Sequence, residues 1–228
     1  FGIALAAPIY KFFEKHVPGV LKGFGVPLLT LLIVFPLTFA VVGPLANQIG
    51  VWINAAISFV FTLSPIIGGT LLGSLWQVLV LFGVHGVLIM IPFMELMQGN
   101  PSQLMAFTVT ACFAQIGVVL AIYFRTKNKK LKSVALPAFI SGIFGVTEPA
   151  IYGVTLPRIK MFVISCISAG FGGLVVVLTG ITMYSYAGMG LIGLLGLLNP
   201  DGAQIFPIVL MVLVSFVSAF IAAFVLFK

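Results

Sequence analysis

Residues 134–157, VALPAFISGIFGVTEPAIYGVTLP, form an apolar stretch whose prolines and glycines exclude one uninterrupted helix. Proline removes a backbone donor and disfavours helix in the residue before it. Basic residues flank the stretch on both sides, in RTKNKKLK at 125–132 and at Arg158 and Lys160. Because basic loops stay on the cytoplasmic side of a membrane, we expect this segment to enter the membrane and return as a re-entrant hairpin.

Glu148 lies in the middle of that stretch, directly before Pro149. Only four acidic residues occur in the whole chain, and the others are Glu14, Glu95 and Asp201. A carboxylate at membrane depth is costly and is a functional-site candidate by default. The structural alternative is that Glu148 caps a half-helix. We favour function, because a cap needs no ionisable group in so dry a setting; Glu95 and Asp201 fit an interface and a turn.

The composition excludes a soluble domain. Hydrophobic residues make up 61% of the chain and charged residues 7%, against about 25% charged residues in soluble proteins. Apolar runs reach the roughly 20 residues that a membrane helix needs, without the alternating strands of a barrel. The sequence therefore predicts an all-α integral membrane protein, a polytopic helix bundle with re-entrant hairpins. The net charge of +7 comes from short loops beside apolar runs, so no nucleic-acid partner is expected.

The apolar runs on either side of the hairpin predict the membrane spans. These cover residues 26–48, 52–72, 76–97, 103–124, 162–179 and 205–227. A turn is expected within 42–50, VGPLANQIG, and a break at Ser64-Pro65. Residues 180–203 fit an outer loop or a second partial dip. Residues 1–25 are predicted as an interfacial amphipathic segment, with a solvated linker as the alternative, ahead of a transmembrane transport region at 26–228.

The two cysteines, Cys112 and Cys166, match no metal or disulfide spacing. We expect both to be buried and inert. No metal site and no cofactor is predicted. The chain begins at Phe1 without a signal-like segment, and we expect it to be a piece of a longer protein.

His85, in the glycine-flanked motif GVHG at 83–86, is the second candidate site residue. A lone histidine in an apolar run is usually a hydrogen-bonded core residue. However, broken helices with a polar group in mid-span are what transporters use for substrate binding. Trp76 and Gln77 begin the same run. Trp76 is either an interfacial anchor or an aromatic face for stacking on a sugar, and both alternatives stay open.

The motif GVTEPAIYGVTLP, with GVHG about sixty residues earlier, resembles the membrane-spanning IIC component of the phosphoenolpyruvate-dependent sugar phosphotransferase system, in its glucose superfamily. The continuation AIYGVTLPRIKMFVISCISAGFGG is most similar to the β-glucoside branch, near the sucrose and trehalose permeases. The resemblance covers essentially all 228 residues, as the C-terminal part of a IIC domain. It implies that the first half of IIC and the IIB domain are absent from this chain.

The resemblance also implies the roles of individual residues. In the family, the glutamate of the motif lies at the tip of a re-entrant hairpin and contacts sugar hydroxyls, which places Glu148 and Thr147 in the sugar site. The histidine of an earlier hairpin faces the same sugar and corresponds to His85. These two, Glu148 and His85, are the candidate catalytic residues. The candidate substrate-binding residues are Glu148, Thr147, His85, Trp76 and Gln77. Some branches have an arginine at the position of Gln77.

The implied function is group translocation: a glucosyl sugar crosses the bacterial cytoplasmic membrane and is phosphorylated on its 6-hydroxyl. The implied partners are the sugar, a phosphorylated IIB domain with IIA upstream, the lipid bilayer and a second copy in a homodimer. The phosphoryl donor is a IIB phosphocysteine, a role that neither cysteine here fits, because a reactive cysteine must be accessible and activated. A proton-coupled secondary sugar transporter is the alternative, and a structural or sensor domain without transport is the third.

Overall fold

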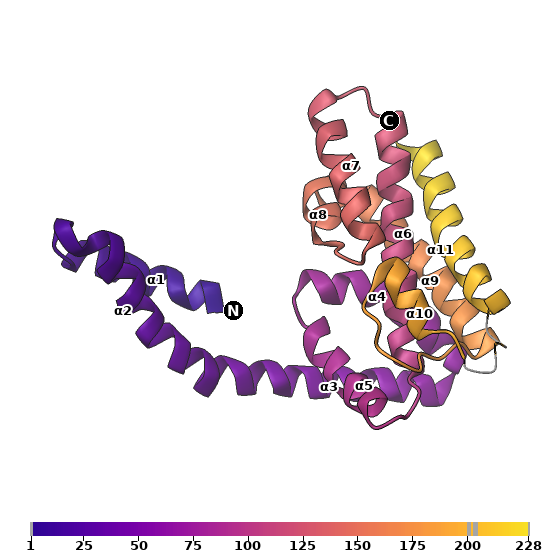
Figure 1. The fold of residues 1–228 in the computed structure, drawn as a ribbon, viewed down its shortest axis with the longest axis horizontal. Coiled ribbons are helices and arrows are strands. Elements are labelled where there is room, and N and C mark those ends of the chain that lie inside the picture. The colour runs from indigo at the N-terminus through magenta and orange to yellow at the C-terminus, as the bar shows by residue number, and fades with distance from the viewer. Residues whose placement is uncertain (1, 200–201, 203–204, 228) are drawn as a thin grey trace. The chain divides into compact units, whose positions relative to one another are not determined.

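The computed structural model of the chain describes residues 2–199, 202 and 205–227 (Figure 1). These residues form helices and one isolated β-bridge, between Ser102 and Met183. Four helical segments are long and apolar enough to cross a membrane, which confirms the predicted all-α polytopic fold. These segments are Gly19–Leu63, Gln103–Arg125, Glu148–Thr179 and Ile205–Leu226. The chain divides into two compact units, Phe1–Ile53 and Asn54–Lys228.

The first unit is a string of helical segments with one short break, at residues 17–18. In chain order it contains α1 (Gly2–His16), the 3₁₀ helix η1 (Gly19–Leu21), α2 (Lys22–Leu37), the π-helix η2 (Thr38–Val42) and the start of α3 (Gly43–Leu63). Helix α1 packs against α2. Helix α1 ends two residues before Pro18. The interfacial role of residues 1–25 stays a prediction.

The predicted turn within 42–50 is wrong. These residues belong to α3, which follows α2 and η2 without a loop, so the expected spans 26–48 and 52–72 are not separate helices. Pro44 is tolerated because the one-residue expansion of the π-helix η2 precedes it. Near the start of a new helical segment, a missing proline N–H costs little. The predicted break at Ser64-Pro65 is confirmed, and the Ser64 hydroxyl caps the next helix by accepting from Ile67 N at 3.4 Å.

The second unit holds the remaining elements. They are α4 (Pro65–Leu81), α5 (His85–Met97), α6 (Gln103–Arg125), α7 (Lys129–Ile143), α8 (Glu148–Ala150), the π-helix η3 (Ile151–Thr155), the 3₁₀ helix η4 (Leu156–Arg158), α9 (Ile159–Thr179), α10 (Gly190–Gly196) and α11 (Ile205–Leu226). The predicted spans 103–124 and 205–227 match α6 and α11. The predicted span 76–97 is divided between α4 and α5. Asp201, assigned to a turn, lies outside the described residues.

Helix α6 forms the centre of the second unit (Figure 1), with α4, α7, α9 and α11 packed against it. Nearly all of its side chains are buried. Helices α4 and α9 cross at small residues spaced four apart, Gly69 and Gly73 on α4 against Ala169 and Gly173 on α9. A Cβ atom on Gly73 would lie 2.7 Å from Ala169 O and 3.2 Å from Gly173 Cα. Glycine is therefore what allows the two backbones to touch, as is common between membrane helices.

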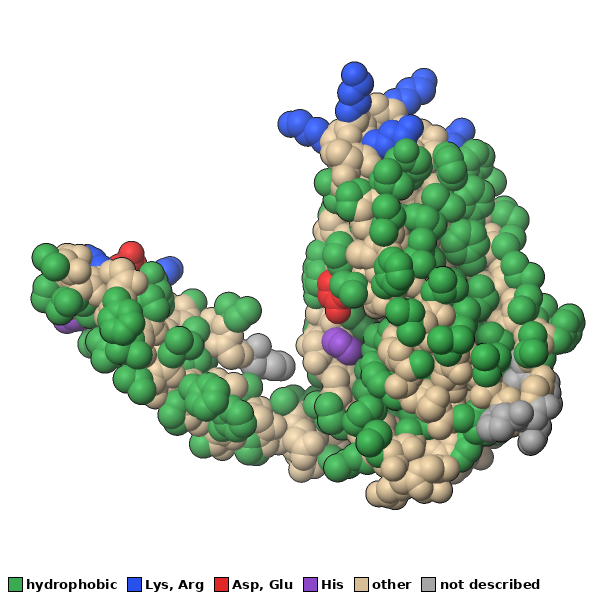
Figure 2. Space-filling view, viewed as in Figure 1, with side chains coloured by type: hydrophobic (Ala, Val, Ile, Leu, Met, Phe, Trp, Pro, Cys, Tyr) green, Lys and Arg blue, Asp and Glu red, His purple; other side chains and the backbone are tan. Residues whose placement is uncertain are grey.

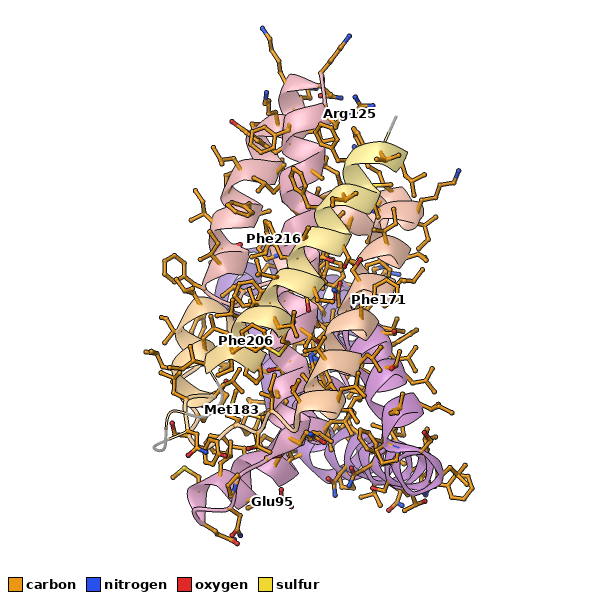
Figure 3. The ribbon with its side chains drawn as sticks, turned by 90° about the vertical axis from the view of Figure 1, so that its right-hand side faces the viewer. Glu95, Arg125, Phe171, Met183, Phe206 and Phe216 are labelled. Carbon is orange, nitrogen blue, oxygen red and sulfur yellow. The ribbon has the colours of Figure 1, made fainter. Side chains whose placement is uncertain are left out.

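The segment 134–157 folds back on itself, as the sequence predicts. Helix α7 leads away from the basic stretch, the chain turns at 144–147, and α8, η3 and η4 lead back to Arg158. Arg158 lines one cavity together with Arg125 and Lys127, so both ends of the hairpin lie at the same end of the unit. Lysine and arginine side chains gather there (Figure 2), and Arg125 lies opposite Glu95 along the unit (Figure 3). We call this the basic end.

Candidate functional site

A small cavity lies where the hairpin meets α4, α5 and α6. It is about 40 Å³ in volume. We call it the site cavity. Its lining residues come from five separate segments and are Trp76, Gln77, Val80, His85, Thr108, Ala111, Cys112, Gly145, Thr147, Glu148 and Met189. All five residues proposed from the sequence, which are distributed over about seventy positions, are therefore neighbours in space. Figure 2 shows an acidic and a histidine side chain side by side on this face.

His85 reaches the site cavity because the chain breaks immediately before it. Helix α4 ends at Leu81, Gly83 has a φ of +72°, and α5 begins at His85 itself. A left-handed φ of this kind is costly for any residue but glycine. The Nδ1 atom of His85 is buried and has no hydrogen-bond partner among the described residues. Buried polar atoms without partners are rare and expensive, so this nitrogen is available to a hydroxyl group that enters the cavity.

Glu148 is placed by the turn at the tip of the hairpin. Gly145 has a φ of +93°, which reverses the chain after α7, and Glu148 begins the returning helix. Within the described residues its carboxylate makes no hydrogen bond or ion pair. The hydroxyl of Thr147 does not cap α8, so the capping alternative finds no support at either residue. The π-helix η3 follows directly, and π-helical turns occur frequently at functional sites.

The tip of the hairpin is held by the loop before α10. Gly190 has a φ of +62°, and a Cβ atom there would lie 2.8 Å from Phe144 C. A Cβ atom on Gly145 would lie 2.7 Å from Met189 C and 2.9 Å from Gly190 N. The two loops thus touch backbone to backbone at positions that only glycine can occupy. The outer loop or second partial dip expected for residues 180–203 stays a prediction.

Gln77 differs from the other candidates because both ends of its amide already have partners. Its Nε2 donates to Ala111 O on α6 at 2.9 Å, and its Oε1 accepts from the Ser165 hydroxyl on α9 at 3.0 Å. The side chain is almost fully buried. Gln77 therefore connects three helices, α4, α6 and α9, within the wall of the site cavity. The second N–H of the amide has no partner among the described residues. It is the main group that Gln77 could offer to a ligand.

Replacing Gln77 by leucine is expected to lower the free energy of unfolding by about 1 kcal/mol, the usual value of a hydrogen bond between membrane helices. Thermal unfolding of the chain in detergent measures the loss. Gln98→Leu is the matched control, because Gln98 is exposed in the turn after α5. Unchanged stability together with weakened sugar binding would contradict a structural role and make Gln77 a ligand.

The sequence did not identify Thr108, Cys112 or Tyr152 as parts of the site. Thr108 and Cys112 are one turn apart on α6 and line the cavity, and the Cys112 thiol donates to Gly142 O at 3.0 Å. The Tyr152 hydroxyl donates to Leu81 O at 3.3 Å, which links the hairpin to the end of α4. Because Thr108 and Cys112 are polar groups one turn apart in a membrane helix, this spacing could have identified them from the sequence. Cys112 and Cys166 are both free, and Cys112 is buried as expected.

The volume of the site cavity limits what it holds in this conformation. About 40 Å³ accommodates roughly three water molecules, which is less than a sugar ring needs. Most of the wall is helix, and its exceptions are Gly145, Thr147 and Met189 in the two loops. A ligand larger than a few water molecules would fit only if the walls of the cavity moved apart.

Three relatives illustrate which proteins the chain is similar to. It is 48% identical over 190 residues, 83% of the chain, to the PTS system beta-glucoside-specific EIIBCA component of Halalkalibacterium halodurans. It is 30% identical over 225 residues, 98% of the chain, to the sucrose-specific EIIBC component of Bacillus subtilis. It is 33% identical over 189 residues, 80% of the chain, to the arbutin-, cellobiose-, and salicin-specific EIIBC component of Escherichia coli.

The matched regions cover only 30%, 49% and 38% of these three relatives. The chain therefore spans less than half of the length of each of these relatives. No solved structure matches the chain. A family model described as "Phosphotransferase system, EIIC" matches residues 1–170, which is most of the chain. The resemblance expected from GVTEPAIYGVTLP is thus confirmed, and the protein belongs to the EIIC family of the phosphotransferase system.

Proposed function

We propose that the chain is part of a membrane permease that takes up a glucosyl sugar and presents its 6-hydroxyl for phosphorylation. The observation that supports this most directly is the pairing of Glu148 and His85 in one cavity of an EIIC-family chain. Each has a polar group without a partner among the described residues, the Glu148 carboxylate and the buried Nδ1 of His85. A sugar supplies hydroxyl groups, which both donate and accept hydrogen bonds and therefore suit both.

The proposed chemistry is transfer of a phosphoryl group from a cysteine of the IIB partner to the sugar. The phosphorus–sulfur bond breaks, a bond forms between phosphorus and the sugar O6, and the O6 proton leaves. Such transfers depend mainly on positioning and charge stabilisation, since their transition state is loose. Glu148 would hold the 6-hydroxyl in line as a hydrogen-bond acceptor and stays available to accept its proton. We favour the positioning role.

The other candidates have supporting positions around the sugar. His85 would fix the orientation of the ring by hydrogen bonding through Nδ1. Trp76 lines the cavity and is nearly fully buried, so it would offer an aromatic edge or face to the ring rather than an interfacial anchor. Thr147, half-buried beside Glu148, has a hydroxyl that does not cap α8. Gln77 would act mainly by holding the helices of this wall together.

The substrate class and the partners are also proposals. The relatives named above are specific for beta-glucosides, sucrose, or arbutin, cellobiose and salicin, and the highest identity among them favours a β-glucoside. These relatives are named EIIBCA or EIIBC components, so each name includes a B component together with the C component. This supports a phosphorylated IIB domain as partner, with IIA upstream. The sources of the relatives are bacteria, and we propose the bacterial cytoplasmic membrane as the location, with a homodimer as the assembly.

The chemical state of the imported sugar tests this function. Full-length protein in proteoliposomes is given labelled β-glucoside outside and phosphorylated IIB inside, and the internal product is analysed. We expect sugar 6-phosphate, formed only when phosphorylated IIB is present. Omitting IIB while imposing a pH gradient is the control. Entry of unmodified sugar driven by that gradient would contradict group translocation and favour a proton-coupled transporter.

A further inference from the structure

Two hollows lie next to each other at the basic end of the second unit. The first, about 560 Å³ in volume, is lined by the cations Arg125, Lys127 and Arg158 together with polar groups of Thr126 and Asn128. We call it the basic cavity. The second, about 910 Å³, lies between the first two turns of α9 and the end of α11 and is lined mostly by apolar side chains. We call it the apolar groove.

The two hollows are continuous. Arg158 and Phe227 line both of them, so the cationic lining of one passes directly into the hydrocarbon lining of the other. In the groove, Ile159, Val163 and Leu226 are between 46% and 60% exposed. The surface therefore offers charge at one end and uncovered apolar area at the other, within a single depression.

The positive charge of the basic cavity has no counter-charge nearby. Neither hollow is lined by a carboxylate, and among the described residues Glu95 lies at the opposite end of the unit (Figure 3). Two of the cations are held in place. The guanidinium of Arg125 lies 5.3 Å from the centroid of the Phe224 ring, and Arg158 Nη1 donates to Val154 O at 3.0 Å. Each guanidinium has five N–H donors, so both keep most of them for an anion.

The position of the hollows matches the boundary of a bilayer. Three membrane-crossing segments reach it: α6 ends at Arg125, α11 ends at Leu226, and α9 begins at Ile159. Cations at the ends of membrane helices lie at the level of the lipid headgroups. Ile159 and Leu226 line the groove at these helix ends and Val163 lines it one turn further along α9, where the acyl chains begin beneath the headgroups. The basic cavity and the apolar groove therefore occupy the two levels of one lipid molecule.

We propose that the basic cavity and the apolar groove together bind an anionic phospholipid. Its phosphodiester accepts hydrogen bonds from Arg125 and Arg158, as arginines do in paired contacts with phosphate, and Lys127 adds a third positive charge. An acyl chain covers Ile159, Val163 and Leu226 in the groove. Basic pockets between membrane helices are known to bind lipid headgroups. A free phosphate would fill the cavity alone and leave the groove uncovered, which is why a lipid is the better occupant.

The test compares an anionic with a neutral lipid on the purified chain. The protein in uncharged detergent receives equal amounts of dioleoyl phosphatidylglycerol and dioleoyl phosphatidylcholine, and native mass spectrometry counts the lipids retained. The unmodified chain should retain phosphatidylglycerol preferentially. In the double variant Arg125→Gln/Arg158→Gln, the preference should fall by about fivefold for each arginine removed. The single variant Arg125→Gln changes an exposed side chain and should fold even if the double variant folds poorly. Its preference for phosphatidylglycerol should fall by about fivefold.

Two further variants separate the lipid site from general charge attraction. Lys129→Gln/Lys130→Gln removes the same charge at the same end from residues that line neither hollow, and should leave the preference unchanged. Val163→Trp fills the groove without altering charge and should reduce retention of phosphatidylglycerol. An equal loss in the lysine pair, no effect of Val163→Trp, or complete displacement of the lipid by excess inorganic phosphate would each overturn the proposal.

Discussion

Changing Glu148 to glutamine is expected to reduce IIB-dependent phosphorylation of the sugar by about 100-fold, the usual cost when a reacting group is no longer held in line. The substitution keeps the size of the side chain but replaces one acceptor oxygen by an amide NH2 donor and removes the negative charge. The carboxylate has no ion pair or hydrogen bond to lose within the described residues, so the fold should tolerate the change. The assay is the formation of sugar 6-phosphate by full-length protein in membranes.

Glu95→Gln is the matched control for that experiment. Glu95 is, like Glu148, an exposed glutamate in an apolar chain, but it lies near the end of α5, at the opposite end of the unit from Arg125 (Figure 3), and does not line the site cavity. Its replacement should leave phosphorylation close to that of the unmodified protein. A Glu148→Gln protein that phosphorylates sugar normally would remove Glu148 from the chemistry, and with it the main support for the proposed function of the site cavity.

Adding one methyl group at Gly73 is the second change with a large expected effect. In Gly73→Ala, the new Cβ atom lies 2.7 Å from Ala169 O and 3.2 Å from Gly173 Cα. Both are backbone atoms of α9, which cannot rotate away as a side chain can. Helices α4 and α9 must then separate, and overpacking of this kind costs about 1–3 kcal/mol. Thermal unfolding in detergent should show the loss.

Gly86→Ala provides the comparison for Gly73→Ala. A Cβ atom on Gly86 meets nothing within 4 Å, and alanine favours helix over glycine by about 1 kcal/mol. Gly86→Ala should therefore unfold at the same temperature as the unmodified chain or a higher one. If Gly73→Ala is as stable as Gly86→Ala, the close crossing of α4 and α9 does not contribute to the stability of the bundle.

The fold-back of the hairpin was easier to predict from the sequence than the helices beside it, and the five proposed site residues lie around one cavity, while their roles stay predictions. The hairpin follows from local signals, since the prolines and glycines of 134–157 interrupt the helix and cations mark both of its ends. Glu148 and His85 are the rare polar groups of apolar runs, which is a property of the sequence itself. Their proximity follows from the family resemblance, because no local pattern joins residues sixty positions apart.

Two features of the fold lay beyond local reasoning. Gly43 and Pro44 have turn character, yet they begin α3, because the π-helix η2 absorbs the irregularity before them. The meeting of Gly145 with Gly190 is a contact between distant loops, and glycines with positive φ are compatible with many partners. The wall residues Thr108 and Cys112 were missed for a similar reason: which face of α6 is turned toward the hairpin depends on how the whole bundle packs.

The contact between the Gly145 turn and the Gly190 loop has a mechanical consequence. Each loop fills the space where a side chain of the other would be, so a side chain added at either glycine would push the two loops apart. The opposite wall, on α4 and α6, belongs to a bundle fastened by Gln77 and by close helix crossings. The site cavity is thus lined by helices of the bundle on one side and by these two loops on the other. Any change that separates the two loops is therefore expected to displace Glu148 and Met189 relative to Trp76.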